Sequence, residues 1–222
     1  QVTPGKFPDV DNYDACYLPD GRIIFTSTAC MIGVPCVYGG SHVTNTYIMD
    51  ADGRRESIRQ LTFDQEHNWS PCVMNNGRVL YTRWEYVDKE VIRVQSLWTV
   101  NPDGTGLSAF WGNQSRWPDM LLNARLIPGT RKVLFSAVGH HDAYAGPLGI
   151  VDQNEGMNYP DGVYNLTPHL ALSAAPSELW AANIGDGNSR RARITADPVA
   201  ADGTLDVDEN SATSTSVGTV AA

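Results

Sequence analysis

The chain has 222 residues, of which 42% are hydrophobic and 18% charged, and its formal net charge is −9. This composition is typical of a globular protein with a core of its own, and it provides no basic stripe for nucleic acid or an anionic membrane surface. No apolar run approaches the ~20 residues of a membrane-spanning helix. We therefore expect neither nucleic-acid binding nor a membrane span.

The chain starts at Gln1 without an initiator methionine or an apolar leader, which indicates a mature chain or a piece of a longer one. An acidic composition and cysteine-containing loops favour an exported protein, either periplasmic or extracellular. The four cysteines form no CxxC or CxxCH motif. We therefore expect neither a zinc knuckle nor a covalently bound c-type haem within this chain.

The first repeated element is a glycine turn followed by a short apolar strand. The string DGRIIFT recurs as NGRVLYT and, more loosely, within PGTRKVLFS. The turn glycines Gly21, Gly77 and Gly129 lie 56 and then 52 residues apart. Asp-Gly and Asn-Gly pairs favour tight turns, and the β-branched and aromatic residues that follow favour buried strands.

A second marker has nearly the same period. The strings YIMDADG, WTVNPDG and IVDQNEG end at Gly53, Gly104 and Gly156, which are 51 and 52 residues apart. Capping of turns explains the Asp and Asn side chains in these strings, and calcium ligation is the alternative. Because no helix-length periodicity accompanies the repeats, they predict β-propeller blades rather than a helical solenoid.

The segment Ile58–Tyr86 marks the predicted seam between two blades. We expect Arg59–Leu61 to end the outer strand of one blade and Phe63–Ser70 to form a polar and aromatic crossing loop. The next blade's inner strand is then expected over Pro71–Arg83, with a turn at the Asn-Asn-Gly sequence inside it.

These patterns divide the chain into three predicted parts. Residues 1–170 are predicted to form about three four-stranded antiparallel blades, which is an incomplete ring because propellers close with roughly four to eight blades. Residues 171–203 show no clear fourth turn–strand unit, which indicates a degenerate blade or a linker. Residues 204–222 are expected to be an irregular tail. The edges of this all-β arc are expected to pair with other blades or another protein subunit.

Cys16 and Cys72 fall five residues before their repeat glycines, on neighbouring predicted inner strands. Their Cα atoms are then too far apart for a bond, so we expect them to be unpaired with each other. Cys30 and Cys36 flank a short MIGVP loop and are candidates for a small disulfide. Two unpaired buried thiols are the alternative.

Several long strings within residues 14–152 carry a family resemblance, among them CYLPDGRIIFTSTAC, RQLTFDQEHNWSP and NGRVLYTRWEY. The chain resembles the TolB-like, WD40-like (PD40) β-propeller group, and more closely the propeller region of hydrazine synthase alpha-subunit-like proteins. The resemblance implies a propeller in an exported bacterial protein. It also implies c-type haem chemistry, which this chain lacks the CxxCH motifs to support. The tail strings LDVDENS and VGTV resemble the first strand of a cadherin-like repeat.

His140-His141-Asp142 is the most metal-like cluster in the sequence, and it follows the apolar strand Lys132–Val138. Adjacent histidines diverge on an extended backbone, so one site needs a further ligand from a neighbouring blade, such as His67 or Glu66. The predicted ligands are His140, His141 and His67. Loop histidines that are hydrogen-bonded to the backbone are the alternative.

Trp69 and Trp117 stand at similar places before predicted inner strands and are candidates for holding a sugar or peptide by stacking. Packing between blades is the alternative. Arg83, Glu85 and Arg125 are candidates for the mouth of the central channel, where they would contact a ligand or partner. Ion pairs that hold blades together explain them equally well.

The sequence contains no GxSxG nucleophile motif and no Walker or dinucleotide glycine pattern. We therefore expect a non-catalytic propeller segment that scaffolds or binds a partner within a larger exported protein. The alternative is the propeller part of a multihaem redox enzyme subunit whose haem domains lie outside this chain.

Overall fold

The computed structural model describes residues 7–88, 94–115, 117–140 and 146–167, together with strands β13 (Thr195–Ala196) and β14 (Leu205–Asp206). Within these ranges the chain is almost entirely β-structure. It contains two 3₁₀ turns, η1 (Pro35–Val37) and η2 (Arg55–Ser57), and no α-helix. None of the described residues forms a helix with the length and apolar character needed to cross a membrane.

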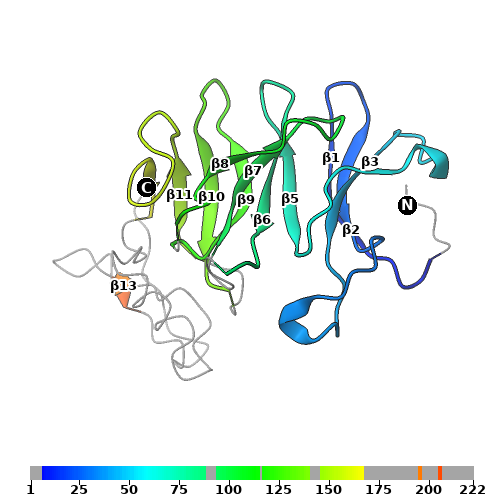
Figure 1. Ribbon diagram of the computed structural model, residues 1–222. Helices are drawn as coiled ribbons and strands as arrows, with labels where there is room; N and C mark the ends of the chain where they lie inside the picture. The colour runs from blue at the N-terminus through cyan, green and yellow to red at the C-terminus, as the bar shows by residue number, and fades with distance from the viewer. Residues whose placement is uncertain are drawn as a thin grey trace.

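Residues 12–165 of the described chain form three successive four-stranded blades (Figure 1). Blade 1 consists of β1 (Asn12–Tyr17), β2 (Ile23–Ser27), β3 (Asn45–Met49) and β4 (Arg59–Gln60). Blade 2 consists of β5 (Asn68–Val73), β6 (Val79–Trp84), β7 (Gln95–Val100) and β8 (Ser108–Trp111). Blade 3 consists of β9 (Met120–Leu126), β10 (Val133–Val138), β11 (Leu148–Val151) and β12 (Val163–Asn165).

In each blade every strand pairs antiparallel with the strand that follows it in the chain. Blades 2 and 3 also meet at one parallel pair, Gln95 with Met120. The blades stand side by side as an arc, and within the described ranges the arc does not close into a ring (Figure 1). The predicted fold, about three antiparallel propeller blades in an incomplete ring, is confirmed.

The predicted seam between blades 1 and 2 is partly wrong. The inner strand of blade 2 is β5, which starts at Asn68 inside the expected crossing loop, and the segment Val79–Trp84 is the second strand of the blade. Pro71 lies inside β5, although proline is seldom found inside a paired strand. Here it follows Ser70 in a bulge, between the paired residues Trp69 and Cys72, where the ladder is interrupted and needs no N–H donor.

The turn residues behave as the repeat predicts. Gly21, Gly77 and Gly129 have φ values of 88°, 80° and 74°, in the left-handed region where glycine has no steric penalty. The carboxylates of Asp20, Asp52 and Asp103 each accept a hydrogen bond from the backbone N–H two residues later, at 3.0, 3.1 and 2.9 Å. These contacts support turn capping, rather than calcium ligation, as the role of these side chains.

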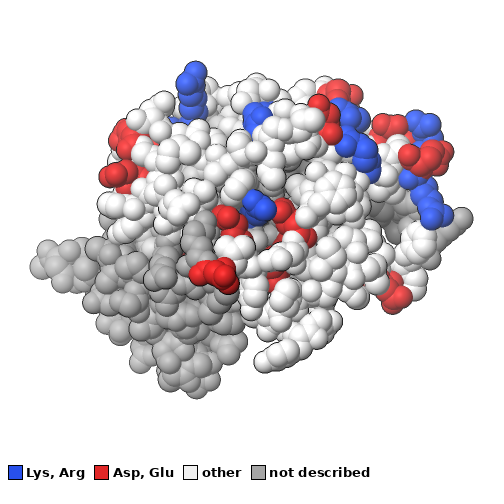
Figure 2. Space-filling model, in the orientation of Figure 1, with Lys and Arg blue, Asp and Glu red and all other residues white. Residues whose placement is uncertain are grey.

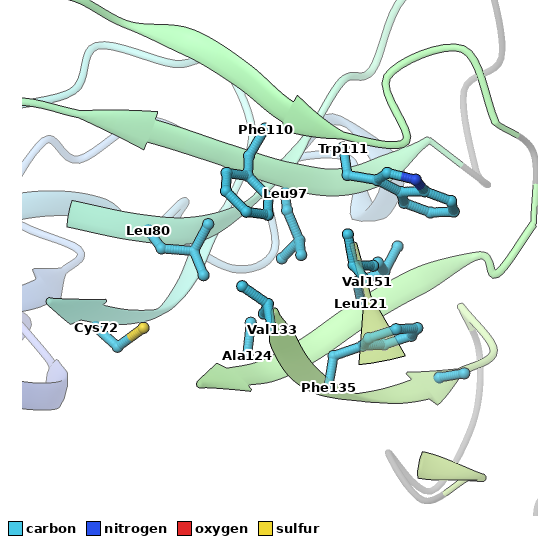
Figure 3. Packing of buried hydrophobic residues seen from close by; sticks show 11 residues of the cluster. Cys72, Leu80, Leu97, Phe110, Trp111, Leu121, Ala124, Val133, Phe135 and Val151 are labelled. Carbon is cyan, nitrogen blue, oxygen red and sulfur yellow. The ribbon is translucent and has the colours of Figure 1, made fainter. Parts of the chain in front are cut away.

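Hydrophobic side chains fill the gaps between blades. The contact between blades 1 and 2 is built by buried residues that alternate along their strands, namely Ile24, Ile48, Val79, Tyr81 and Val100. The contact between blades 2 and 3 is larger and includes Leu80, Leu97, Trp111, Leu121 and Phe135 (Figure 3). Burying one such side chain stabilises the fold by about 1.5–3 kcal/mol, so these two layers fix the arc.

Gly149 of β11 lies directly opposite Phe135 of β10, and the phenyl ring lies over it. A Cβ atom added at this position would be 2.5 Å from Phe135 Cζ. Because that ring is buried and close-packed, it has little room to move. The missing side chain therefore allows the ring to pack in this layer.

We expect Gly149→Ala to lower the free energy of unfolding by about 2 kcal/mol, as overpacking does in tight cores. Urea unfolding of the purified chain measures this change. The double variant Gly149→Ala/Phe135→Leu, which has a smaller side chain opposite the alanine, should regain part of the loss. An effect of the single variant below about 0.5 kcal/mol would contradict the prediction.

The predicted C-terminal parts lie mostly outside the described residues. In residues 171–203, which we expected to be a degenerate blade or a linker, the structure describes β13. In the predicted tail, residues 204–222, it describes β14. These two strands pair antiparallel with each other, Thr195 with Asp206 and Ala196 with Leu205. The cadherin-like interpretation of the tail stays a prediction.

Candidate functional site

A cavity of about 920 Å³ lies where the inner strands of the three blades begin. The first residues of β1, β5 and β9 line it, and the loop before β3 contributes His42 and Thr44. We call it the channel cavity. It is the place in a propeller arc where inner strands from several blades expose side chains to one space.

Each inner strand carries a β-bulge near its start. The bulge residues are Asp14, Ser70 and Asn123, with φ values of 52°, 51° and 53°, and the strand register shifts at each of these places. Non-glycine residues seldom adopt this conformation, although Asp and Asn do so more readily than others. Bulges redirect side chains and are common next to functional sites. Three bulges at equivalent places therefore indicate that they have the same role in each blade.

The bulge residues are hydrogen-bonded to one another across the blades. The backbone N–H of Ser70 donates to Asp14 Oδ2 at 2.9 Å, and Ser70 Oγ donates to Asn123 Oδ1 at 3.2 Å. A continuous polar chain therefore joins blades 1, 2 and 3 along the inner face. This polar chain was not predicted from the sequence. The signal was present, since these residues are 56 and 53 residues apart, in phase with the turn glycines.

His67 lines the channel cavity in a fixed protonation state. Its Nδ1 accepts a hydrogen bond from the Thr44 backbone N–H at 3.1 Å, while the Thr44 hydroxyl donates to the Asn68 carbonyl at 2.8 Å. Burial lowers the pKa of His67 to about 4, so the imidazole is neutral at physiological pH. With Nδ1 as the acceptor, the proton resides on Nε2.

Aromatic rings continue from His67 along the same end of the arc. The His67 ring stacks on Trp69 with centroids 4.9 Å apart, and Trp69 stacks on Trp84 at 6.1 Å. The His140 ring packs edge-on against Trp84, with ring centroids 4.6 Å apart. The His67 ring also stacks on Trp84, with centroids 6.3 Å apart, so two of the three predicted metal ligands pack against the Trp84 indole.

The ring nitrogens of His140 are near other side chains. Its Nδ1 is 2.6 Å from Gln95 Nε2, and its Nε2 is 4.0 Å from Cys36 Sγ. Among the described residues, no group of three or more His, Cys, Asp or Glu side chains is arranged to hold a metal ion. The third predicted ligand, His141, lies outside the described residues, so the three-histidine metal site stays a prediction.

Glu66, considered as an additional metal ligand, is a buried acid next to His67. The residue is 0% exposed, and neither carboxylate oxygen has a hydrogen-bond partner within the described part of the chain. Burial raises the pKa of Glu66 to about 7, and the neighbouring His67 backbone N–H partly opposes this rise. The side chain therefore changes its charge near neutral pH.

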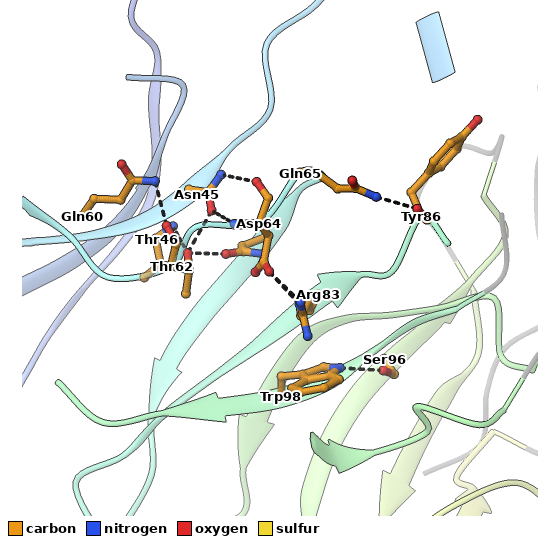
Figure 4. A network of polar contacts seen from close by, with 11 residues as sticks. Asn45, Thr46, Gln60, Thr62, Asp64, Gln65, Arg83, Tyr86, Ser96 and Trp98 are labelled. Atoms are coloured by element: carbon orange, nitrogen blue, oxygen red, sulfur yellow. Dashed lines mark hydrogen bonds and ion pairs between the residues drawn. The ribbon is translucent and has the colours of Figure 1, made fainter. Parts of the chain in front are cut away.

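Arg83 makes the ion pair that the sequence left as one of two alternatives. Its Nε and Nη2 donate to Asp64 Oδ1 at 2.9 and 2.7 Å, and its guanidinium lies 4.4 Å from the Trp98 ring centroid. Asp64 also accepts from Asn68 Nδ2 at 3.0 Å, which extends the polar network between blades 1 and 2 (Figure 4). This geometry favours a role in holding the blades together.

The other predicted contact residues have different surroundings. Glu85 lies just after β6, where its backbone N–H donates to the Val94 carbonyl at 2.9 Å. Trp117 is 3% exposed and packs edge-on against Tyr159 with ring centroids 4.7 Å apart. Its placement favours packing over ligand stacking. Trp69 differs, because it lines the channel cavity.

All four cysteines are free thiols in the structure. Cys30 Sγ contacts the Val43 carbonyl at 3.2 Å and Asn45 Nδ2 at 3.7 Å, whereas Cys36 Sγ points towards His140. The proposed disulfide between Cys30 and Cys36 is therefore absent, because the two thiols are engaged in different directions. Cys16 and Cys72 are likewise not joined to each other.

Charge is sparse on the face shown in Figure 2, where most Lys and Arg side chains lie beside Asp or Glu. On this face the described residues form no continuous basic patch. Such pairing is seen at Arg22 with Asp20 and at Arg54 with Asp50 and Asp52.

Comparison with known proteins agrees with the architecture. Hydrazine synthase of Kuenenia stuttgartiensis superposes with a TM-score of 0.56 and 16% sequence identity, over 73% of this chain and 25% of that chain. The likeness shows a β-propeller fold. A protein described as a gluconolactonase matches with a TM-score of 0.45 and 16% identity, over 71% of this chain and 48% of that chain. No protein-family model and no curated protein matches the sequence.

Proposed function

We propose that this chain is a non-catalytic propeller segment that serves as a scaffold or binds a protein partner within a larger exported bacterial protein. We further propose that this protein belongs to the hydrazine synthase alpha-subunit-like group, of the TolB-like or PD40 propeller type. The chain spans about a quarter of the hydrazine synthase chain that it resembles in fold. The proposed location is the periplasm or the cell exterior.

One comparison between equivalent strands carries the scaffold proposal. The inner strand β1 is exposed along nearly its whole length, with Tyr13 and Tyr17 49% and 68% exposed. The equivalent strands β5 and β9 are mostly buried. All three have the same place in their blades, but β1 starts the arc, and among the described residues no blade lies beside it on the side away from β5. A further blade or another subunit would supply a neighbour on that side.

Hydrogen exchange tests this proposal. The 222-residue chain alone is compared with the complete protein, or with its subunit complex, by mass spectrometry of peptides covering β1 and β5. We expect protection of β1 amides to rise in the larger assembly, while β5 amides are protected in both. Unchanged exchange of β1 in the complete protein would overturn the proposal.

The alternative, a propeller part of a multihaem redox subunit, is favoured by the structural similarity to hydrazine synthase. This chain does not fit a covalently held c-type haem, because none of its four cysteines belongs to a CxxCH motif and all four are on separate strands or loops. In this alternative the haem lies elsewhere in the protein. A pyridine haemochrome spectrum of the complete protein distinguishes the two functions, since only the alternative predicts haem.

A further inference from the structure

The channel cavity is lined mainly by polar and aromatic side chains. Its polar groups are two carboxylates, two imidazoles and several Ser and Thr hydroxyls, and its rings are Tyr13 and Trp69. No Lys or Arg of the described residues lines it. Its volume of about 920 Å³ lies within the range of small-molecule sites, roughly 300–1,000 Å³.

Asp14 is held in place as a hydrogen-bond acceptor. Its left-handed backbone and the bulge in β1 aim the side chain across the inner face, where the Ser70 backbone N–H bonds to Oδ2. The other carboxylate oxygen has no partner within the described chain. Since the residue is exposed and lines the cavity, this oxygen is available to a ligand.

His67 supplies the complementary donor. The Thr44 backbone N–H occupies its Nδ1, so the neutral ring carries its proton on Nε2. Its stacked neighbour Trp69 holds the ring plane. The cavity therefore contains a fixed acceptor on blade 1 and a fixed neutral donor in the loop between blades 1 and 2.

Aromatic surface accompanies these polar groups. Tyr13 is half-exposed on β1, and Trp69 lines the cavity from β5, on the next blade. Phenol and indole rings offer an apolar face together with a polar edge, which suits ligands that have both C–H faces and hydroxyl groups.

From this combination we propose that the channel cavity binds a neutral carbohydrate, with Asp14 accepting from a sugar hydroxyl, His67 donating to one, and Tyr13 and Trp69 packing on the ring. A sugar hydroxyl both donates and accepts, so a lining that mixes fixed acceptors, neutral donors and hydroxyls matches it. An anion lacks a cationic partner here, and an organic cation gains nothing from a neutral donor such as His67. The proposal needs only the three described blades, and it is independent of the scaffold role.

The test measures binding to the full 222-residue chain by isothermal titration calorimetry and saturation-transfer NMR. The probes are cellobiose, maltose and chitobiose, with spermidine and inorganic phosphate as probes for cationic and anionic ligands. We expect at least one disaccharide to bind, and neither spermidine nor phosphate to compete with it.

Asp14→Asn is the central variant, because asparagine tolerates the left-handed backbone and keeps an oxygen for the Ser70 N–H. Loss of the carboxylate should weaken disaccharide binding about tenfold, the worth of one hydrogen bond to a charged group. Tyr13→Ala, at an exposed position where unfolding is not expected, should also weaken it about fivefold. Asp103→Asn, which alters an exposed turn carboxylate outside the cavity, is the matched control and should bind within about twofold of the original chain.

Three outcomes overturn the proposal: no disaccharide binding at millimolar concentration by a chain that unfolds cooperatively, binding that Asp14→Asn and Tyr13→Ala leave unchanged, or binding of spermidine or phosphate alone. Disaccharide binding that is weakened by both variants and unaffected by Asp103→Asn supports it.

Discussion

Replacing Arg83 by methionine is expected to lower the free energy of unfolding by about 3 kcal/mol, because it leaves a buried carboxylate without its cation. The Asp64 side chain is 9% exposed, and two guanidinium nitrogens of Arg83 bond to its Oδ1. The same guanidinium lies over the Trp98 ring. Methionine has no charge and therefore cannot make this cation–π contact. Urea unfolding at neutral pH gives the difference.

Arg54→Met is the matched control for this prediction. Arg54 also makes short ion pairs, at 2.6 Å with Asp52 and at 2.8 Å with Asp50, but its side chain is 57% exposed. Water screens exposed pairs, so this variant should change stability by less than about 0.5 kcal/mol. Equal losses from Arg83→Met and Arg54→Met would contradict a special role for the Arg83 pair.

Replacing Glu66 by glutamine is expected to stabilise the fold at alkaline pH, by about 3 kcal/mol at pH 8. The folded protein holds Glu66 with a pKa of about 7, above its ordinary value of 4.5, because the side chain is buried. At pH 8 the original chain must therefore keep an ionised carboxylate away from water. The glutamine has nearly the same shape and carries no charge.

The pH window follows from the direction of the shift. A raised folded pKa means that protonated Glu66 favours the fold below pH 4.5, and that this contribution falls between 4.5 and 7 and is lost above 7. At pH 5 the variant should therefore differ from the original chain by less than about 1 kcal/mol. Thermal or urea unfolding at pH 5, 6.5 and 8 would map this dependence.

The contribution of His67 to stability depends on pH in the opposite direction from that of Glu66. Its folded pKa of about 4 lies below its ordinary value of 6.5, so its contribution to stability is full above pH 6.5 and is lost as the pH falls towards 4. Both chains in the comparison contain His67, and its effect cancels in their difference. Glu56→Gln, at an exposed position on η2, is the control and should change the free energy of unfolding by less than about 0.5 kcal/mol. A pH-independent effect of Glu66→Gln would sink the prediction.

The blades were predictable because their signals are local. Turn glycines such as Gly21 and Gly77 need a left-handed backbone, and the β-branched and aromatic residues after them favour strands, so both features can be recognised in short windows of sequence. The start of β5 was not predictable in the same way. A bulge accommodates Pro71, and bulges depend on the partner strand as much as on the residue itself.

The site was harder to predict because its contacts join distant parts of the chain. Trp69 and Trp117 occupy similar sequence positions, yet one lines the channel cavity and the other is buried against Tyr159. Arg83 forms an ion pair with Asp64, which lies in the loop before blade 2. Whether Arg83 faces the channel or forms this ion pair therefore depends on the path of that loop. Sequence spacing alone does not determine such paths.

The bulge residues Asp14, Ser70 and Asn123 have a consequence for how such a protein evolves. Each unit brings a short polar side chain to the seam: the Ser70 backbone N–H donates to the Asp14 carboxylate, and the Ser70 hydroxyl donates to the Asn123 side-chain oxygen. A copy of the unit produced by gene duplication therefore arrives with the groups needed to join its neighbour. Adding a blade by tandem duplication therefore requires no new residues for the hydrogen bonds between blades.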